Sequence, residues 1–127
     1  MMEPDSELDR LAHDVIGAAI EVHRCLGPGF LEEAYEKAFC LELEARNIPY
    51  KRQVAVTVTY WGQEISTGFL DILVADRLII ELKAVESLAP IHTAQAISYL
   101  RMTGHRLALL INFNVPVLRQ GVRRIIL

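Results

Sequence analysis

Cysteine is scarce in this chain. Only Cys25 and Cys40 occur among 127 residues, and neither has a neighbour at the spacing of zinc ligands, which argues against a cysteine-based zinc site. Both lie in segments with a helical pattern, where an unpaired cysteine usually behaves as a small buried hydrophobic residue. We therefore expect two buried free thiols and a reducing, cytoplasmic setting.

Long hydrophobic runs are also lacking. The longest, such as Leu107 to Ile111, are far too short to cross a bilayer. Residues 1–5 are acidic, and they lack the basic region and the apolar run of a signal peptide. The sequence therefore predicts no association with a membrane.

Acidic residues are absent from Ser87 to Leu127, although the whole chain carries a net charge of −3. This net charge argues against a protein that coats nucleic acid through bulk electrostatics. The acid-free stretch has two interpretations, which are a solvated basic surface and a flank that faces phosphates beside an acidic metal site. Its basic residues are Arg101, Arg106, Arg119, Arg123 and Arg124.

Composition and periodicity predict a globular α/β domain that spans residues 1–127. Hydrophobic residues make up 52% and charged residues 23% of the chain, and a chain of this length buries enough surface for a core. Apolar residues at steps of three and four predict a helix from Ser6 to Leu26, capped by Asp5 or Ser6 and ended by Gly27. A second helix is predicted from Leu31 to Arg46.

The remaining segments predict a mixed sheet. Alternating apolar residues, turn signals and Pro90 at a helix start mark the boundaries. The predicted strands are 54–60, 64–74, 78–85, 106–113 and a short 122–127, and a third helix covers 90–103. The resulting order, α-α-β-β-β-α-β, is typical of a mixed central sheet flanked by helices.

The hairpin formed by the second and third strands carries the acidic residues of interest. A three-residue turn centred on Asp76 would pair Asp71 directly with Glu81, with Cβ atoms about 5 Å apart. Alternation places Glu81 and Lys83 on one face of their strand. On the preceding strand it places Asp71 on the face opposite to that of Leu70, Ile72 and Val74.

Two facing carboxylates repel each other, and sheets usually avoid such pairs. A bound divalent cation would remove the repulsion, and Mg²⁺ prefers one or two carboxylates together with waters and phosphate oxygens. Lys83 would then hold an attacking water or stabilise phosphate charge. The alternative is that these residues are ordinary surface charges, and a two-residue turn would break the facing register.

Four motifs resemble those of a known superfamily. Asp71 followed by Glu81-Leu82-Lys83 resembles the Asp…(Asp/Glu)-x-Lys motif of the PD-(D/E)XK nucleases, and the element order is similar to their core. Gln95 to Tyr99 resembles the Gln-x-x-x-Tyr motif of the RecB-like branch. Gly29 to Tyr35 resembles the signature of the bacterial GxxExxY family, and the resemblance extends over nearly the whole chain. Leu70 replaces the proline of the superfamily name, a position that carries no chemistry.

The resemblance implies a role for each matching residue. Asp71 and Glu81 would be metal ligands together with the Leu82 main-chain carbonyl, Glu32 would be an additional acid beside the metal, and Lys83 would be the catalytic lysine. The residues implied to approach the substrate are Gln95, Tyr99, Tyr35 and Arg101. For both tyrosines, packing in the core is the alternative, and His92 lies near the same helix face without a second ligand at suitable spacing.

The function implied is hydrolysis of phosphodiester bonds in nucleic acid, with DNA favoured over RNA and with Mg²⁺ or Mn²⁺ as the cofactor. The alternative is a non-catalytic module of the same fold that binds nucleic acid or a protein partner. The sequence contains no separate nucleic-acid-binding module. Specificity would therefore come from the domain's own helices, from a homodimer or from another protein.

Overall fold

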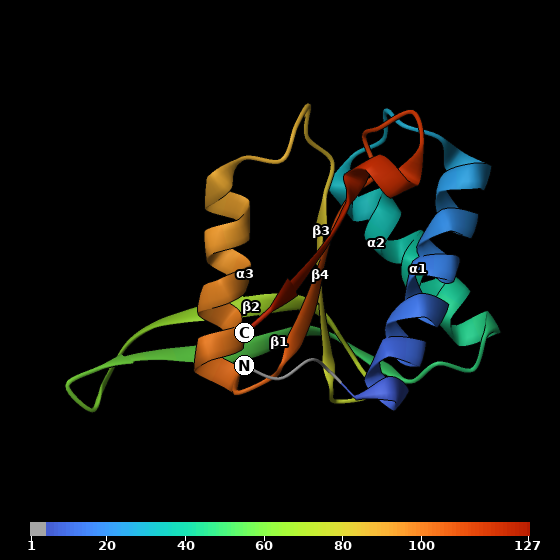
Figure 1. Cartoon of the computed structure of the whole chain (residues 1–127). Coiled ribbons are helices and arrows are strands. Elements are labelled where there is room, and N and C mark those ends of the chain that lie inside the picture. Colours follow the sequence, from blue (N-terminus) through green and yellow to red (C-terminus); the bar gives the residue numbers. More distant parts are fainter. Residues whose placement is uncertain (1–4) are drawn as a thin grey trace.

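A five-stranded sheet separates two layers of helices. The computed structural model describes residues 5–127. The prediction of no signal peptide concerns residues 1–5, of which 1–4 lie outside the described residues. Helices α1 (Ser6–Leu26) and α2 (Glu32–Ala45) lie on one side of the sheet, and α3 (Pro90–Thr103) lies on the other (Figure 1). The strands are β1 (Tyr50–Tyr60), β2 (Gln63–Val74), β3 (Leu78–Lys83), β4 (Leu107–Asn112) and β5 (Val122–Ile126).

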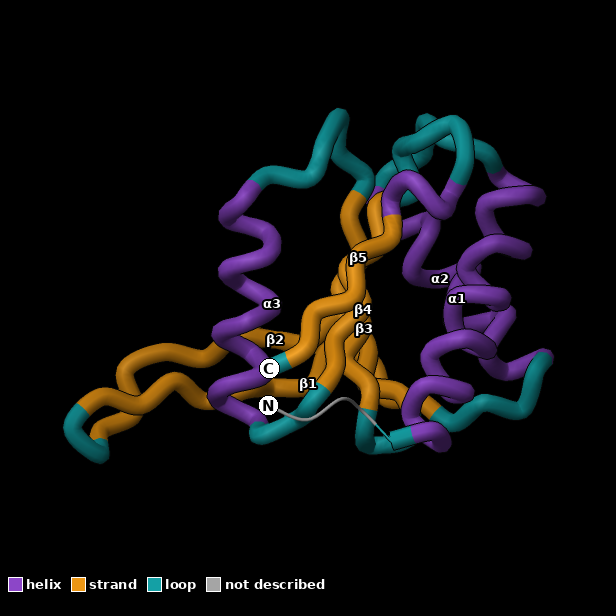
Figure 2. The backbone as a smooth tube through the Cα atoms, in the orientation of Figure 1, coloured by secondary structure: helices purple, strands orange, loops and turns teal. Residues whose placement is uncertain are grey.

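The strands follow one another across the sheet in chain order. Neighbouring strands are antiparallel except for β3 and β4. These two are parallel because α3 carries the chain back to the end of the sheet at which β3 begins (Figure 2). The predicted order α-α-β-β-β-α-β and the mixed sheet are thus confirmed. One short 3₁₀ helix, Leu118–Gly121, was not predicted. In the part of the chain that the structure describes, no helix is long and apolar enough to span a membrane.

Local signals in the sequence place the helix ends. The Asp5 side chain accepts a hydrogen bond of 2.7 Å from the backbone N–H of Leu8 and caps α1, as expected for an acidic residue at this position. Pro90 occupies the first turn of α3, where its missing N–H costs nothing. Gly104 ends α3 with a φ of 78°, in the left-handed region that glycine adopts without strain.

The core has two parts, one on each face of the sheet. Ile72, Val74 and Ile80 pack with α1 and α2, whereas Leu70 and Ile79 pack with α3. The prediction that Leu70, Ile72 and Val74 share a face is therefore wrong for Leu70. The alternation of β2 changes between Leu70 and Ile72, at the position of Asp71.

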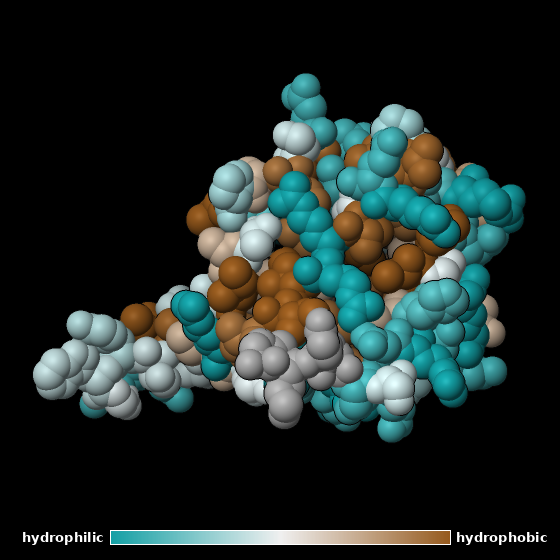
Figure 3. Space-filling model, in the orientation of Figure 1, coloured by the Kyte–Doolittle hydropathy of each residue, from teal (hydrophilic) through white to brown (hydrophobic). Residues whose placement is uncertain are grey.

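The hairpin of β1 and β2 extends past α3 and away from the sheet (Figure 1). Its two-residue turn has positive φ angles at Trp61 (53°) and Gly62 (72°), the geometry that matches the twist of a hairpin. Trp61 is 87% exposed. Figure 3 shows mostly hydrophilic residues over the outer hairpin, whereas hydrophobic residues gather between α3 and β5.

The two cysteines differ from each other in their surroundings. Both are free, and Cys40 is buried as expected, but Cys25 is exposed, so the prediction of a buried thiol is wrong there. Cys25 lies in the last turn of α1, where its thiol donates to a Glu21 carboxylate oxygen at 3.3 Å on the solvent-facing surface. This bond and partial desolvation raise the pKa of the Cys25 thiol.

Asn112 ties the end of β4 to the segment that follows Lys83. Its side chain is 1% exposed. The amide oxygen accepts from the backbone N–H groups of Val85 (3.0 Å) and Asn114 (3.2 Å), and the amide nitrogen donates to the Val85 carbonyl (2.9 Å). These bonds fix the chain directly after the lysine of the Glu-x-Lys motif.

We expect Asn112→Ala to lower the free energy of unfolding by about 2–4 kcal/mol, because it removes three hydrogen bonds and leaves partly buried backbone groups of Val85 and Asn114 unpaired. Urea unfolding followed by circular dichroism measures this change. Asn114→Ala is the matched control, since Asn114 contributes its backbone N–H to the same cluster. Equal stability of the two variants would contradict the prediction.

Candidate functional site

Asp71 of β2 and Glu81 of β3 each accept a hydrogen bond from the backbone of the other residue's strand. The backbone N–H of Asp71 donates to a Glu81 carboxylate oxygen at 2.9 Å, and the backbone N–H of Leu82 donates to an Asp71 carboxylate oxygen at 2.7 Å. The regular β2–β3 pairing stops one residue earlier, at Ile72 and Ile80, with the turn centred on Asp76 as predicted. We call Asp71 and Glu81 the crossed carboxylate pair.

Burial and like charge act together on this pair. Glu81 is 4% exposed, and burial, followed by the Asp71 charge, raises the pKa of Glu81 to about 8. Burial also raises the pKa of Asp71, against the lowering effect of the Leu82 N–H. The two acids therefore do not both ionise readily at neutral pH, and a nearby positive charge would favour their ionised forms.

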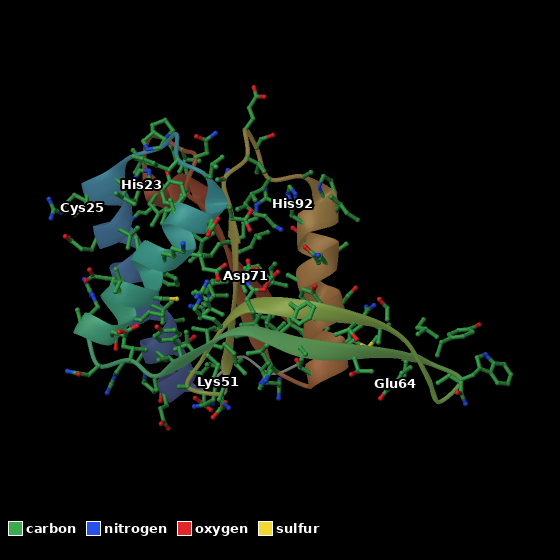
Figure 4. The ribbon with its side chains drawn as sticks, turned by 180° about the vertical axis from the view of Figure 1, so that it is seen from behind. His23, Cys25, Lys51, Glu64, Asp71 and His92 are labelled. Atoms are coloured by element: carbon green, nitrogen blue, oxygen red, sulfur yellow. The ribbon has the colours of Figure 1, made fainter. Side chains whose placement is uncertain are left out.

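Lys83 and Glu32 complete the surroundings of the pair. Glu32 is the first residue of α2, and burial and the Asp71 charge raise the pKa of its carboxyl, while the Lys83 charge lowers it. Lys83 likewise lowers the pKa of Asp71 and of Glu81. Figure 4 shows Asp71 between the layer of α2 and the layer of α3. The four predicted residues thus interact in one place.

A second group of polar residues, which the sequence analysis missed, lies behind Asp71. Glu36 is one helical turn after Glu32 and is only 7% exposed. Arg52 donates to one Glu36 oxygen through Nε (3.1 Å) and Nη2 (2.9 Å), and Gln53 Nε2 lies 3.2 Å from both Glu36 oxygens. We call Glu36, Arg52 and Gln53 the Glu36 network. The four-residue spacing of Glu32 and Glu36 was a signal that could have revealed Glu36, but not its partners on β1.

The donor set fits a hard divalent cation. Each carboxylate of the crossed pair accepts one backbone N–H through one oxygen, which leaves its other oxygen for a further ligand. Within residues 5–127, no three His, Cys, Asp or Glu side chains are preassembled around one position. An ion here would draw its remaining ligands from backbone, water or phosphate, which is the usual coordination of Mg²⁺.

Comparison with known proteins agrees with this geometry. A family model described as the PD-(D/E)XK nuclease superfamily matches residues 9–125. The chain belongs to this superfamily. The superfamily is named for nucleases, which generally use divalent metal ions. Searches of curated proteins and of solved structures found no significant match.

Tyr35, which ends the Gly29–Tyr35 motif, is fully buried within this superfamily fold. Its hydroxyl donates to the Gly27 carbonyl at 2.5 Å and accepts from the Phe30 N–H at 3.2 Å. Its ring stacks on that of Phe113 at a centroid distance of 4.5 Å. These contacts favour the packing alternative for Tyr35, because its hydroxyl is used to hold the loop before α2.

The α3 residues that the superfamily motif singles out differ in placement. Tyr99 is half-buried and lies against β2 so closely that a Cβ at Gly68 would be 2.9 Å from its hydroxyl. Gln95 and Arg101 are exposed on the same helix. His92 Nδ1 accepts from the Ala89 N–H at 3.0 Å and so caps the start of α3, which favours the structural alternative for His92.

The arginines of the acid-free stretch do not gather on one side. On the edge strand β5, Arg124 pairs with Asp9 of α1 at 2.6 Å, whereas Arg123 reaches Thr93 of α3 at 3.4 Å. Adjacent strand residues point to opposite faces, so these two charges are separated by the sheet. This placement favours a dispersed, solvated basic surface over a continuous flank.

We expect Tyr35→Phe to lower the free energy of unfolding by about 1–3 kcal/mol, because it removes the bond to Gly27 and leaves the Phe30 N–H without its acceptor. Chemical denaturation of both proteins measures the change. A variant as stable as the wild type would contradict a loop-holding role and restore the substrate-binding interpretation.

The raised pKa of Glu81 predicts a pH dependence of stability. With the folded pKa at about 8 and an ordinary value of 4.5, the native state binds an extra proton between these values, so stability falls as pH rises from 5 to 8. Thermal melts in chelator should show this fall, and Glu81→Gln should flatten it. Glu33→Gln, at an exposed acid of α2, is the control that should keep the wild-type slope. An unchanged slope in Glu81→Gln would contradict the prediction.

Proposed function

We propose that this protein is a metal-dependent nuclease that hydrolyses phosphodiester bonds in nucleic acid, with DNA as the favoured substrate. The observation that carries the proposal is the crossed carboxylate pair beside Lys83, because a buried and a partly buried acid held together by these hydrogen bonds favour a divalent cation. Mg²⁺ or Mn²⁺ is the proposed ion, since both suit carboxylate and carbonyl oxygens.

Asp71, Glu81 and the Leu82 main-chain carbonyl are the proposed ligands. The Leu82 N–H points toward Asp71, and the N–H and C=O of one strand residue point to the same side. The Leu82 carbonyl therefore points to the side of β3 on which Asp71 lies, which supports its role as a ligand. A divalent ion there supplies Lewis-acid stabilisation of the negative charge that develops on a phosphodiester.

Lys83 is the proposed catalytic lysine, and Glu32 is proposed as a further ligand of the metal. The Lys83 ammonium holds the attacking water or stabilises the phosphate, because its charge already acts on both carboxylates. Glu32 contributes a further carboxylate from α2, and its raised pKa reflects the same crowded charges. Gln95, Tyr99 and Arg101 approach the substrate from α3 in this proposal.

We assign the chain to the bacterial GxxExxY family within the superfamily. Gly29, Glu32 and Tyr35 support this assignment, because Glu32 faces the crossed pair and Tyr35 fixes the preceding loop. A cytoplasmic setting is consistent with the two free cysteines. In this proposal, a second copy of the chain or another protein supplies additional specificity.

One observation favours a second candidate, a non-catalytic module that binds nucleic acid or a protein partner. The crossed pair is satisfied by backbone N–H groups of β2 and β3. These bonds hold the hairpin together without an ion, so the same residues are compatible with a purely structural use of the motif.

A cleavage assay with single-stranded, double-stranded and branched substrates tests the proposal. With Mn²⁺ or Mg²⁺ we expect cleavage by the wild type, and a loss of about 10²–10³-fold in rate for Lys83→Ala and for Asp71→Asn. Lys37→Ala is the matched control, because this exposed lysine of α2 pairs with Glu33 and faces away from the crossed pair.

Two outcomes would contradict the nuclease proposal. Cleavage that persists in both site variants would place the activity elsewhere. Absence of cleavage under either metal, together with a nucleic-acid or protein complex that survives Lys83→Ala, would support the non-catalytic module.

A further inference from the structure

Gln53 has the most unusual backbone of the sheet. Its φ is 48°, in the left-handed region, and it is the one non-glycine strand residue with a positive φ in the part of the chain that the structure describes. Such a conformation is unfavourable for a residue with a side chain, and it persists only where surrounding contacts enforce it. The position of the strain is therefore informative.

This distortion lies directly opposite Asp71. The β1–β2 pairing joins Arg52 to Ile72 and Val54 to Leu70 without a change of register, and the step between them, Gln53 to Asp71, is left out. Beyond this point the hairpin presents its other face to α3, as Leu70 shows. The irregular step thus coincides with the proposed metal ligand.

The turned backbone directs the Gln53 amide to two acids. Gln53 Nε2 contacts the Glu36 carboxylate at 3.2 Å, and Gln53 lies at the step of β1 directly opposite Asp71, whose pKa its side chain lowers. Carboxylates accept hydrogen bonds, and a side-chain amide nitrogen carries two hydrogens. One NH₂ group is therefore suited to bridge Glu36 and Asp71.

Arg52 fixes the far end of this bridge. Its guanidinium donates to Glu36 through two nitrogens, so Glu36 is held as a buried, charge-compensated anchor rather than as a free acid. The Glu36 network consequently holds the Gln53 amide at the step of β1 that lies opposite Asp71.

We propose that Gln53 is a positioning residue, whose amide spans Glu36 and Asp71 and orients the Asp71 carboxylate toward a divalent cation shared with Glu81. This inference rests on the proposed metal-dependent function, and it assigns to β1 a part in the site that the motif residues on β2, β3 and α2 do not cover. Residues that orient metal ligands in this way typically change metal affinity by about 10- to 100-fold when removed.

Calorimetric titration of Mn²⁺ into the full chain tests the proposal with two variants. Gln53→Gly keeps the left-handed backbone available and removes the amide, so we expect unchanged or higher thermal stability but about 10-fold weaker Mn²⁺ binding. Gln53→Met keeps the length of the side chain without a donor, and we expect the same loss of affinity. Asn47→Gly is the matched control, because Asn47 also has a positive φ, of 57°, but lies at the end of α2.

The outcomes separate this inference from the function on which it rests. Wild-type affinity in both Gln53 variants, together with lost binding in Asp71→Asn, would overturn the positioning role and leave the metal site intact. No Mn²⁺ binding by the wild type would overturn both. Weaker binding in the Gln53 variants, with normal binding in Asn47→Gly, supports the role of the amide rather than relief of backbone strain.

Discussion

The exchange of hydrogen bonds between Asp71 and Glu81 is the constraint on which the site depends. Each carboxylate takes the place of a backbone acceptor on the neighbouring strand, so the side chains are held by the sheet itself rather than by flexible contacts. The cost is electrostatic, because two acids are brought together under burial. The Lys83 charge offsets part of this electrostatic cost, and the part that is not offset favours the binding of a further cation.

The rest of the architecture serves to bring acids from three elements to one point. The turn at Asp76 sets the register of β2 against β3, and the start of α2 adds Glu32 from the other layer. Asn112 holds the chain after Lys83. These contacts join residues far apart in sequence, so the site requires the complete sheet rather than the hairpin alone.

Much of this arrangement could be predicted from local signals. Helix ends at Asp5 and Gly104 follow from capping chemistry, and the register of β2 against β3 up to Ile72 follows from the turn length. The Glu36 network could not be predicted in the same way, because Arg52 and Gln53 resemble ordinary surface residues of a strand. The predicted alternation of faces along β2 was wrong at Leu70 because it ignores long-range contacts. Arg52 and Gln53 of β1 contact Glu36 of α2, and this contact accompanies the distortion of the hairpin next to Leu70.

The extended β1–β2 hairpin places the chain's only tryptophan at its outer tip, where the indole is largely surrounded by solvent. Tryptophan emission responds to changes in the solvent exposure of the ring. Loss of the core therefore changes the surroundings of Trp61 little, and intrinsic fluorescence is a poor reporter of unfolding here. The same property makes it a selective optical probe for any molecule that covers the end of the hairpin.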